Sequence, residues 1–271
     1  RPRPRAAAGP QPPAPAPSSR FRRWAAGGAL RPAGGLRARG MAGAPARGGA
    51  RATATLRDAA RRFEEAWPRG AGGPRRRADG GKRGAGRAAV LVGLFEEPGV
   101  PLSVWLTQRG GQLSSHAGEV ALPGGKQEGA ETAEETALRE ADEEIGLGPG
   151  DCRVVGQLEA CLSKHRLLVS PVVAAVRAGF TPRIASPDEV AAVFSCPLAE
   201  FLSAERHRAV DLPQRGRVHF FDYNDPRTGR DFIIWGLTAH LLIETARHVY
   251  EQEPGFDFFG AGDTGEAAGK L

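Results

Sequence analysis

Cysteine and long apolar runs are scarce in this chain of 271 residues. Its three cysteines form no C-x-x-C pair, which argues against a disulfide scaffold or a cysteine zinc site and suits a reducing compartment. Cys161 and Cys196 are expected to be ordinary core residues. The longest apolar stretch, Leu167–Val176, is interrupted by Ser170 and Pro171. A membrane-spanning helix needs roughly 20 apolar residues, so the sequence predicts a soluble protein.

Acidic residues are absent from the first 57 residues, which hold 12 arginines. Residues 58–87 add 9 basic and 4 acidic side chains, whereas residues 88–271 hold 16 basic and 27 acidic ones. The formal net charge of +6 therefore combines a basic arm with an acidic domain of net charge −11. A basic chain would otherwise indicate binding to nucleic acid or to a membrane surface. The charge distribution argues against this for residues 88–271.

Composition divides the chain into three parts. Residues 1–87 are rich in Arg, Ala, Gly and Pro, and hold too little bulky apolar surface to offset the entropy of ordering. They are predicted to be a disordered basic arm and linker, within which residues 54–67 have the pattern of one short helix. Residues 88–254 are long enough to bury a core of their own. Residues 255–271 are Gly-rich and are predicted to be a flexible tail.

Strands and helices are expected to alternate between residues 88 and 254, which indicates an α/β fold. A helix is expected over residues 131–145, because it is rich in Ala, Glu and Leu and stops at Gly146. Residues 110–125 are polar and Gly-rich and predict a loop. Further helices are predicted over 197–203 and 237–250, and strands over 89–95, 102–107, 152–162, 169–176, 190–194, 218–223 and 232–235.

Three carboxylates gather in the helix expected over residues 131–145. Glu140, Glu143 and Glu144 have the spacing i, i+3, i+4, which places them on one helix face. Clustered carboxylates repel each other unless a cation neutralises them, and hard oxygen ligands suit Mg²⁺ or Mn²⁺. This combination fits metal-assisted attack of water on a phosphate. The alternative is an acidic face that only contacts solvent, which is what a generic E-x-x-E-E helix usually has.

Two neighbouring features favour the metal interpretation. Arg139 precedes Glu140 and can pair with a carboxylate and hold it in place. Gly124 and Gly125 allow the backbone to approach a metal ion or a phosphate closely. The helix and the two glycines together therefore predict a site for a divalent cation and a phosphate group.

Residues 125–147 fit the pattern G-x5-E-x7-R-E-U-x-E-E-x-G-U, in which U is an aliphatic residue. All of the fixed identities are present, and the departure is Ala141, which is smaller than the usual first U residue. This pattern is the Nudix box, and the chain resembles the Nudix hydrolases. The fixed residues are Gly125, Glu131, Arg139, Glu140, Glu143, Glu144 and Gly146.

The resemblance implies a Nudix fold, in which a mixed β-sheet is sandwiched between helices (α/β/α). It also implies hydrolysis of a nucleoside diphosphate linked to another moiety, with Glu140, Glu143 and Glu144 as the catalytic residues. Glu140 and Glu144 would be the principal metal ligands, and the Gly124 carbonyl would join them. Glu143 would be a third ligand or would orient the attacking water. The residues implied to be structural are Gly125, Glu131, Arg139 and Gly146.

A second motif lies upstream of the Nudix box. LTQR over residues 106–109 is followed by LSSHAGEVALPGGK over residues 113–126, which resembles the extra motif of the coenzyme A diphosphatase branch, and its plant members in particular. Gly110 and Ser114 depart from the usual Ser or Ala and the usual Arg. The resemblance implies cleavage of coenzyme A or acyl-coenzyme A to 3′,5′-ADP and 4′-phosphopantetheine or its acyl form. Similar stretches continue to about residue 254.

Side chains around the second motif are candidates for substrate contacts. Arg109 can grip a phosphate with two hydrogen bonds, or it is a surface arginine at a strand end. His116 can bind the substrate or fasten the loop. Glu119 faces either metal or solvent, and the motif favours involvement.

Charged residues outside that loop are further candidates. Lys126 and Lys164 can neutralise phosphates in an otherwise acidic domain, although a single lysine is more often a surface residue. Glu189 precedes an expected strand and is a candidate additional ligand or base. His240 and His248 are expected to be ordinary helix positions.

Three alternatives to a coenzyme A diphosphatase stay open. The first is a Nudix enzyme that acts on ADP-ribose, NADH or nucleoside triphosphates. The second is a nucleic-acid-binding protein that works through the arginine arm. The arm has few aromatics beyond Phe21 and Trp24, so a small nucleotide is the expected partner. The third is a catalytically silent Nudix scaffold, against which the intact carboxylate set argues.

The arginine-rich arm resembles an organelle-targeting presequence. A mitochondrial location is expected, with a plastid as the alternative, although Ser18 and Ser19 are the only serines in residues 1–57. A translation start at Met41 would leave a shorter arm that is still basic and acid-free, and the protein would be cytosolic if that arm is not a signal. The C-terminal sequence GKL only approximates the S-K-L peroxisomal address.

Overall fold

The fold is built on a mixed sheet with β1 at its centre. A computed structural model of the chain describes residues 54–67, 86–97, 99–110, 118–212 and 216–259. The helices are α2 (Leu56–Ala66), α3 (Ala133–Ile145) and α4 (Gly236–Tyr250), with a 3₁₀ helix over Leu198–Leu202. The strands are β1 (Gly86–Glu97), β2 (Val100–Arg109), β3 (Val120–Ala121), β4 (Gly124–Lys126), β5 (Cys152–Gln157), β6 (Cys161–Leu162), β7 (Leu167–Val176), β8 (Val190–Pro197), β9 (His207–Leu212), β10 (Gly216–Asn224) and β11 (Asp231–Trp235).

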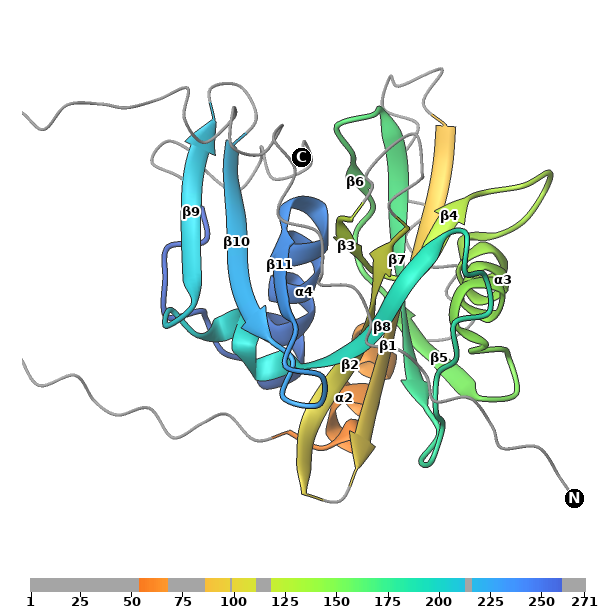
Figure 1. Cartoon of the computed structure of the whole chain (residues 1–271), viewed down its shortest axis with the longest axis horizontal. Coiled ribbons are helices and arrows are strands. Elements are labelled where there is room, and N and C mark those ends of the chain that lie inside the picture. The colour runs from red at the N-terminus through yellow and green to blue at the C-terminus, as the bar shows by residue number, and fades with distance from the viewer. Residues whose placement is uncertain (1–53, 68–85, 98, 111–117, 213–215, 260–271) are drawn as a thin grey trace, which may run out of the picture. The chain divides into compact units, whose positions relative to one another are not determined.

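The large sheet has the order β3-β2-β1-β7-β5, and β4, β6 and β8 pair with β1, β7 and β2, respectively. β1 and β7 run parallel, whereas the other pairings are antiparallel. A small antiparallel sheet has the order β11-β10-β9. In Figure 1, α3 lies beside the large sheet and α4 lies beside the small one. This architecture confirms the expected α/β fold with a mixed sheet and flanking helices.

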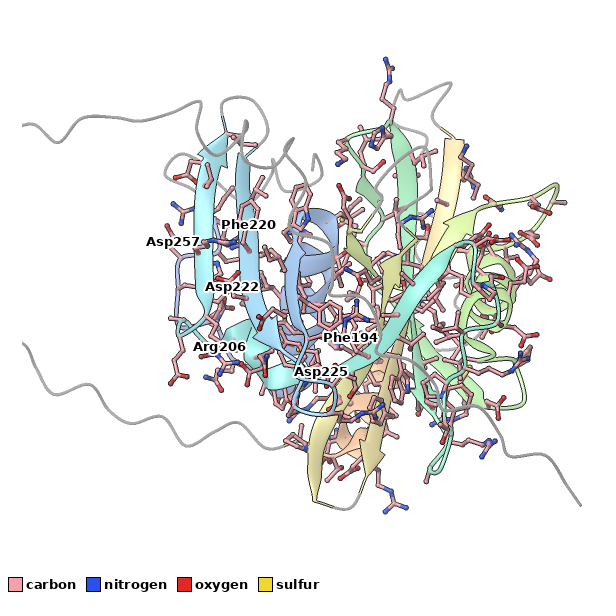
Figure 2. All side chains as sticks on the ribbon, in the orientation of Figure 1. Phe194, Arg206, Phe220, Asp222, Asp225 and Asp257 are labelled. Atoms are coloured by element: carbon pink, nitrogen blue, oxygen red, sulfur yellow. The ribbon has the colours of Figure 1, made fainter. Side chains whose placement is uncertain are left out.

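The segment after α4 packs against the small sheet. His219 on β10 joins His207 on β9 (Nδ1 to Nε2, 2.9 Å) and the Phe258 carbonyl (Nε2 to O, 3.2 Å). Because the carbonyl needs a donor, His219 donates to it from Nε2 and accepts from His207. Burial lowers the pKa of both rings, that of His207 to about 4. Arg217 also pairs with Asp257, labelled in Figure 2 (2.8 Å). The flexible tail expected over residues 255–271 is therefore incorrect for residues 255–259, which buried aromatic side chains anchor.

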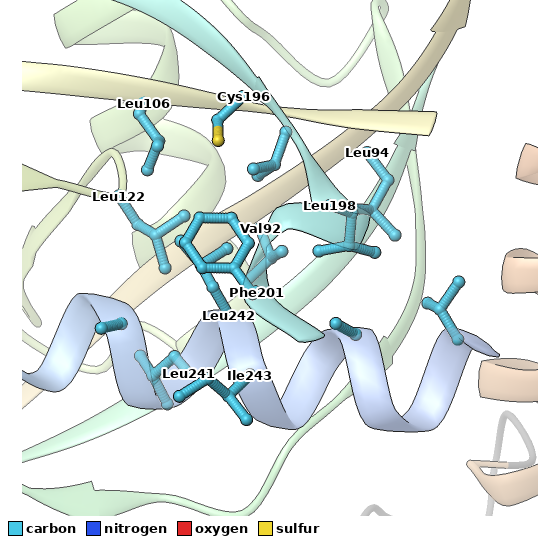
Figure 3. Packing of buried hydrophobic residues seen from close by; sticks show 14 of the residues in the cluster. Val92, Leu94, Leu106, Leu122, Cys196, Leu198, Phe201, Leu241, Leu242 and Ile243 are labelled. Carbon is cyan, nitrogen blue, oxygen red and sulfur yellow. The ribbon is translucent and has the colours of Figure 1, made fainter. Parts of the chain in front are cut away.

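Alternating side chains of the large sheet supply two apolar layers. Ala89 and Leu91 of β1 face α3, whereas Val92 and Leu94 face the layer that contains α2 and α4. Figure 3 shows both in this second layer, Val92 near Leu242 of α4 and Leu94 near Leu198. The period of two is what a strand buried on both faces requires.

Helix α2 belongs to the second layer, although it lies upstream of the expected domain boundary at residue 88. Thr55 caps it through a capping box with Asp58, and Ala59 and Phe63 are 0% and 1% exposed. Arg62 ties the helix to α4 by donating to the Val249 carbonyl. The short helix expected over residues 54–67 is therefore confirmed, whereas its assignment to a disordered arm outside the domain is incorrect. The average composition of an arginine-rich stretch conceals a single buried face made of two alanines and one phenylalanine.

Most expected elements are present, and the differences are local. The loop expected over residues 110–125 contains the short strands β3 and β4, and the strand expected over 152–162 is divided into β5 and β6. β9 was not expected from the sequence because most of its side chains are exposed, so it lacks an alternating apolar pattern.

Cys161 and Cys196 are free and buried, which confirms that they are core residues. None of the helices in the described ranges has the length and apolarity needed to span a bilayer.

We predict that Phe63→Ala lowers the free energy of unfolding by about 3–5 kcal/mol, because truncating a buried phenylalanine leaves a cavity. Arg61→Ala on the exposed face of α2 is the control, since its ion pair with Glu65 is solvent-exposed and worth about 0.5 kcal/mol or less. Urea unfolding of the full chain measures both. Equal effects of the two substitutions would show that α2 does not contribute to the core.

Candidate functional site

Helix α3 is capped at both ends and held against the large sheet by its apolar side chains. Thr132 and Glu135 form a capping box at its start, and Gly146 ends it with a left-handed φ of 71°. Ala137, Ala141 and Ile145 are 0% exposed and pack against β1 and β7. Small residues at two of these positions bring the helix close to the sheet.

Two carboxylates of α3 are buried near each other. Glu144 is only 4% exposed, and no hydrogen-bond partner for its Oε2 lies in the described part of the chain. Burial raises the pKa of Glu144 to about 8, and the negative charges of Glu140 and Glu189 add to this, while Arg109 and the Gly124 backbone act in the opposite direction. Burial also raises the pKa of Glu140. A buried carboxylate with one oxygen unsatisfied calls for a cation.

Gly124 and Gly125 lie where the backbone of β4 meets β1 and the Glu140 carboxylate. A Cβ on Gly125 would lie 2.2 Å from Glu140 Oε1, and a Cβ on Gly124 would lie 2.4 Å from the Ala89 carbonyl oxygen. The contact at Gly124 is with backbone atoms, so this position needs glycine, whereas a side chain at Gly125 would have to displace the Glu140 carboxylate. The glycines were expected from the sequence to let the backbone approach a metal ion or a phosphate; their close neighbours in the structure are β1 and the Glu140 carboxylate.

Arg139 holds three carboxylates together. Its Nε donates to Glu131 at 2.7 Å, and its Nη1 donates to Glu140 at 3.0 Å and to Glu143 at 3.1 Å. Hydrogen bonds from Arg139, and then from the backbone N–H of Glu128, lower the pKa of Glu131 to about 2. The same contacts raise the pKa of Arg139. Glu131 and Arg139 thus occupy the structural positions expected from the motif, while the Glu143 side chain is 56% exposed.

Arg109 ends β2 beside the acidic helix. Its backbone pairs with the loop that precedes β3, donating to the Glu119 carbonyl (2.9 Å) and accepting from the Gly118 N–H (3.1 Å). The Arg109 Nε is buried without a partner among the described residues. A Cβ at the next residue, Gly110, would lie 2.7 Å from the Asp188 carbonyl oxygen. This contact explains why glycine replaces the usual Ser or Ala.

Glu189 enters the site because its loop is fastened to the end of α3. The Ala185 N–H donates to the Glu144 carbonyl (3.0 Å), and the Ser186 hydroxyl donates to the Glu143 carbonyl (2.8 Å). The Glu189 charge contributes to the raised pKa of Glu144, so its carboxylate faces the acidic pair. The side chain is exposed, so it sits at the edge of the site.

The other expected contact residues are dispersed. Lys126 is exposed, and its carbonyl accepts from Arg139 Nη2 at 3.2 Å. Glu119 pairs with Lys164 at 3.6 Å. His240 and His248 both lie on α4, as expected. His116 lies outside the described residues.

The donor set fits a hard cation that binds through few protein ligands. In the described ranges no group of three or more His, Cys, Asp or Glu side chains is arranged to hold a metal ion. On α3, Glu144 is buried and the Glu140 side chain is 15% exposed, whereas Glu143 is held in a more exposed position by Arg139. Mg²⁺ keeps several waters and commonly binds one or two carboxylates together with substrate phosphates. The unsatisfied oxygen of Glu144 is the group in this structure that such an ion would satisfy.

Comparison with known proteins gives consistent matches. A profile of the NUDIX domain matches residues 85–214. Nudix hydrolase 15, mitochondrial, of Arabidopsis thaliana is 48% identical over 174 residues, which cover 63% of this chain and 61% of that protein. Nudix hydrolase 22, chloroplastic, of the same plant is 47% identical over 177 residues, which cover 63% of this chain and 57% of that protein. The mouse (Mus musculus) peroxisomal coenzyme A diphosphatase NUDT7 is 36% identical over 189 residues, which cover 67% of this chain and 79% of that protein. The chain thus spans about three fifths of the two plant relatives.

We predict that Gly125→Ala weakens Mn²⁺ binding at least tenfold, because the new methyl group displaces the Glu140 carboxylate. Gly150→Ala is the matched control, since a Cβ there meets no atom within 4 Å. Titration of each variant with Mn²⁺, followed by electron paramagnetic resonance of the free ion, measures the affinity. Circular dichroism verifies that both variants fold. Unchanged Mn²⁺ affinity in folded Gly125→Ala would remove Glu140 from the cation site.

Proposed function

The chain belongs to the Nudix hydrolase family, and we propose that it hydrolyses the diphosphate bond of coenzyme A and acyl-coenzyme A. The products would be 3′,5′-ADP and 4′-phosphopantetheine or its acyl form. The observation that carries the proposal is the buried Glu144 carboxylate, with one oxygen unsatisfied, beside Glu140 and Arg109. The substrate is supported by the motif over residues 113–126 and by the likeness to a mouse protein named as a coenzyme A diphosphatase.

The proposed cofactor is Mg²⁺ or Mn²⁺, held by Glu140 and Glu144. The Gly124 carbonyl and Glu143 are the further candidate ligands. Bound there, the ion would neutralise the clustered carboxylates and the diphosphate, and would make water a better nucleophile.

The chain's own residues supply positioning and proton transfer. Arg139 fixes the carboxylate of Glu140 through one hydrogen bond. Arg109 lies beside Glu144 with a buried, unsatisfied Nε and is proposed to bind the diphosphate. None of the ion pairs found among the described residues involves Glu189, so its carboxylate at the edge of the site is a candidate to take the proton from the attacking water. Glu143, which Arg139 orients, is the other candidate.

A different nucleotide substrate is the second candidate within the same family. ADP-ribose, NADH and nucleoside triphosphates also present a diphosphate to the carboxylates. A panel of these compounds with coenzyme A and acetyl-coenzyme A, at equal concentration and with Mg²⁺ or Mn²⁺, separates them. We expect the highest kcat/KM for the coenzyme A compounds. A higher kcat/KM for another nucleotide would replace the proposed substrate.

We predict that Glu144→Gln lowers kcat about 100- to 1,000-fold, because charge stabilisation at the reacting phosphate is lost. Glu134→Gln is the control, since Glu134 is exposed in the first turn of the same helix, and it should retain wild-type kcat. Release of 3′,5′-ADP, followed by chromatography, measures both variants. Equal activity of Glu144→Gln and the wild type would exclude the acidic face as the catalytic centre.

We propose that the basic arm directs the protein to an organelle, a mitochondrion in the first instance and a plastid as the alternative. The support is the run of 12 arginines without acids in residues 1–57, together with relatives named as mitochondrial and chloroplastic. Fluorescent fusions of the full chain and of a chain lacking residues 1–53 should differ, with only the former inside the organelle. Identical cytosolic distributions of the two fusions would exclude a targeting role.

A further inference from the structure

Two stacked aromatic rings with a basic group at each end form a row across the small sheet. The set comprises Lys164, Trp235, Phe220 and Arg208, which we call the aromatic–cation row. The Lys164 Nζ lies 5.1 Å from the centre of the Trp235 ring. The Trp235 and Phe220 rings are parallel within 3° at a centroid distance of 5.7 Å, and the Arg208 guanidinium lies 5.0 Å from the Phe220 ring. Figure 2 shows Phe220 on β10, in the interior of the small sheet.

The row begins next to the acidic site. Lys164 pairs with the carboxylate of Glu119, whose carbonyl accepts the backbone N–H of Arg109. Trp235 ends β11, and three residues later the Thr238 hydroxyl donates to the carbonyl of Val120 at 3.2 Å. The end of β11 thus lies beside β3, and Lys164 in the turn after β6 pairs with the residue before β3, whose carbonyl accepts from the backbone of Arg109.

The four members of the row have different exposures and hence different roles. Phe220 is 4% exposed and backs the indole, which fixes the plane of Trp235. Trp235 is only partly buried, and the Lys164 side chain is 41% exposed. Arg208 pairs with Asp222 at 3.2 Å and stays at the far end of the row. Trp235 and Lys164 are thus the members of the row that are open to a ligand.

We propose that Trp235 and Lys164 form a subsite for the nucleoside part of the substrate, in which the base takes the place of the ammonium over the indole and the displaced ammonium binds a phosphate on the ribose. Stacking of a base on an aromatic ring is effective for any base. A lysine ammonium is a compact charge on a flexible stem, and its partly exposed partner Glu119 at 3.6 Å holds it weakly. A phosphate can therefore replace Glu119.

This inference deepens the proposed function and rests on it, because it assigns the substrate class. The row selects nucleotides that carry a second phosphate away from the diphosphate, as coenzyme A does. The described domain is otherwise acidic, so a phosphate far from the cation site needs a basic group of this kind. A nucleotide without the extra phosphate would still stack on Trp235 but would not engage Lys164.

Binding of the cleaved nucleotide tests the subsite without catalysis. Isothermal titration calorimetry without metal compares 3′,5′-ADP with 5′-AMP on the full chain. We expect wild-type protein to bind 3′,5′-ADP about tenfold more tightly than 5′-AMP. Lys164→Gln should abolish this preference, Lys164→Arg should retain most of it, and Trp235→Leu should weaken both ligands about tenfold.

Arg177→Gln is the matched control, because Arg177 is likewise an exposed cation, follows the opposite end of β7 and pairs with an acid, Asp151. It should bind both nucleotides as the wild type does, and thermal unfolding verifies that every variant folds. The subsite is overturned if wild-type protein has no preference for 3′,5′-ADP, or if folded Lys164→Gln keeps it. If the protein prefers 3′,5′-ADP to 5′-AMP but does not cleave coenzyme A, the proposed function is overturned and the subsite stands. If it cleaves coenzyme A but has no such preference, the subsite is overturned and the proposed function stands.

Discussion

The site depends on the burial of the Glu144 carboxylate against a sheet that offers it too few partners. Taking a carboxylate out of water is costly unless a cation or several hydrogen bonds compensate. Here burial and the neighbouring charges of Glu140 and Glu189 outweigh the attraction of Arg109, so the pKa of Glu144 rises. The fold can hold this unfavourable group because α3 is anchored by Ala137, Ala141 and Ile145, all fully buried. Burial of the apolar side of α3 thus offsets the loss of folding free energy caused by the buried carboxylate on its acidic side.

The surrounding elements follow from that arrangement. Gly124 and Gly125 must lack side chains because β4 runs against both β1 and the Glu140 carboxylate. Arg139 compensates the outer part of the acidic face through Glu131, Glu140 and Glu143, and leaves the inner oxygen of Glu144 unsatisfied. The division separates acids that the protein satisfies by itself from the acid left for an external cation.

The sequence was sufficient to place the carboxylates together on α3 but not to identify their partners from distant segments. The i, i+3, i+4 spacing and the two glycines locate the carboxylates, because these relations are local along the chain. The fastening of residues 185–186 to the end of α3 depends on tertiary contacts, so only a weak indication for Glu189 existed. The stacking of Trp235 and Phe220 is likewise a cross-strand contact, fixed by the register of β10 and β11.

The same difference between local and tertiary relations explains why residues 56–66 and 255–259 were not expected to belong to the folded domain. Helix α2 and the aromatic segment at residues 255–259 each bury a few side chains against α4 or the small sheet. Their burial depends on contacts with these distant elements, which the amino-acid composition of a segment does not reveal. An arginine-rich or glycine-rich stretch with only a few apolar side chains can therefore pack against the domain, provided that a neighbouring apolar surface buries those side chains.

Net charge alone is a poor guide to how this domain would meet a phosphate substrate. Residues 88–271 carry a net charge of −11, which would repel a nucleotide at long range if the charge were spread evenly. The described contacts instead place Arg109 beside the buried acids and Lys164 beside Trp235. Interactions within a few ångströms outweigh the screened field of distant charges, because the Debye length at physiological salt is about 8 Å. An acidic domain can therefore bind a polyphosphate wherever its few basic groups are held next to the cation site.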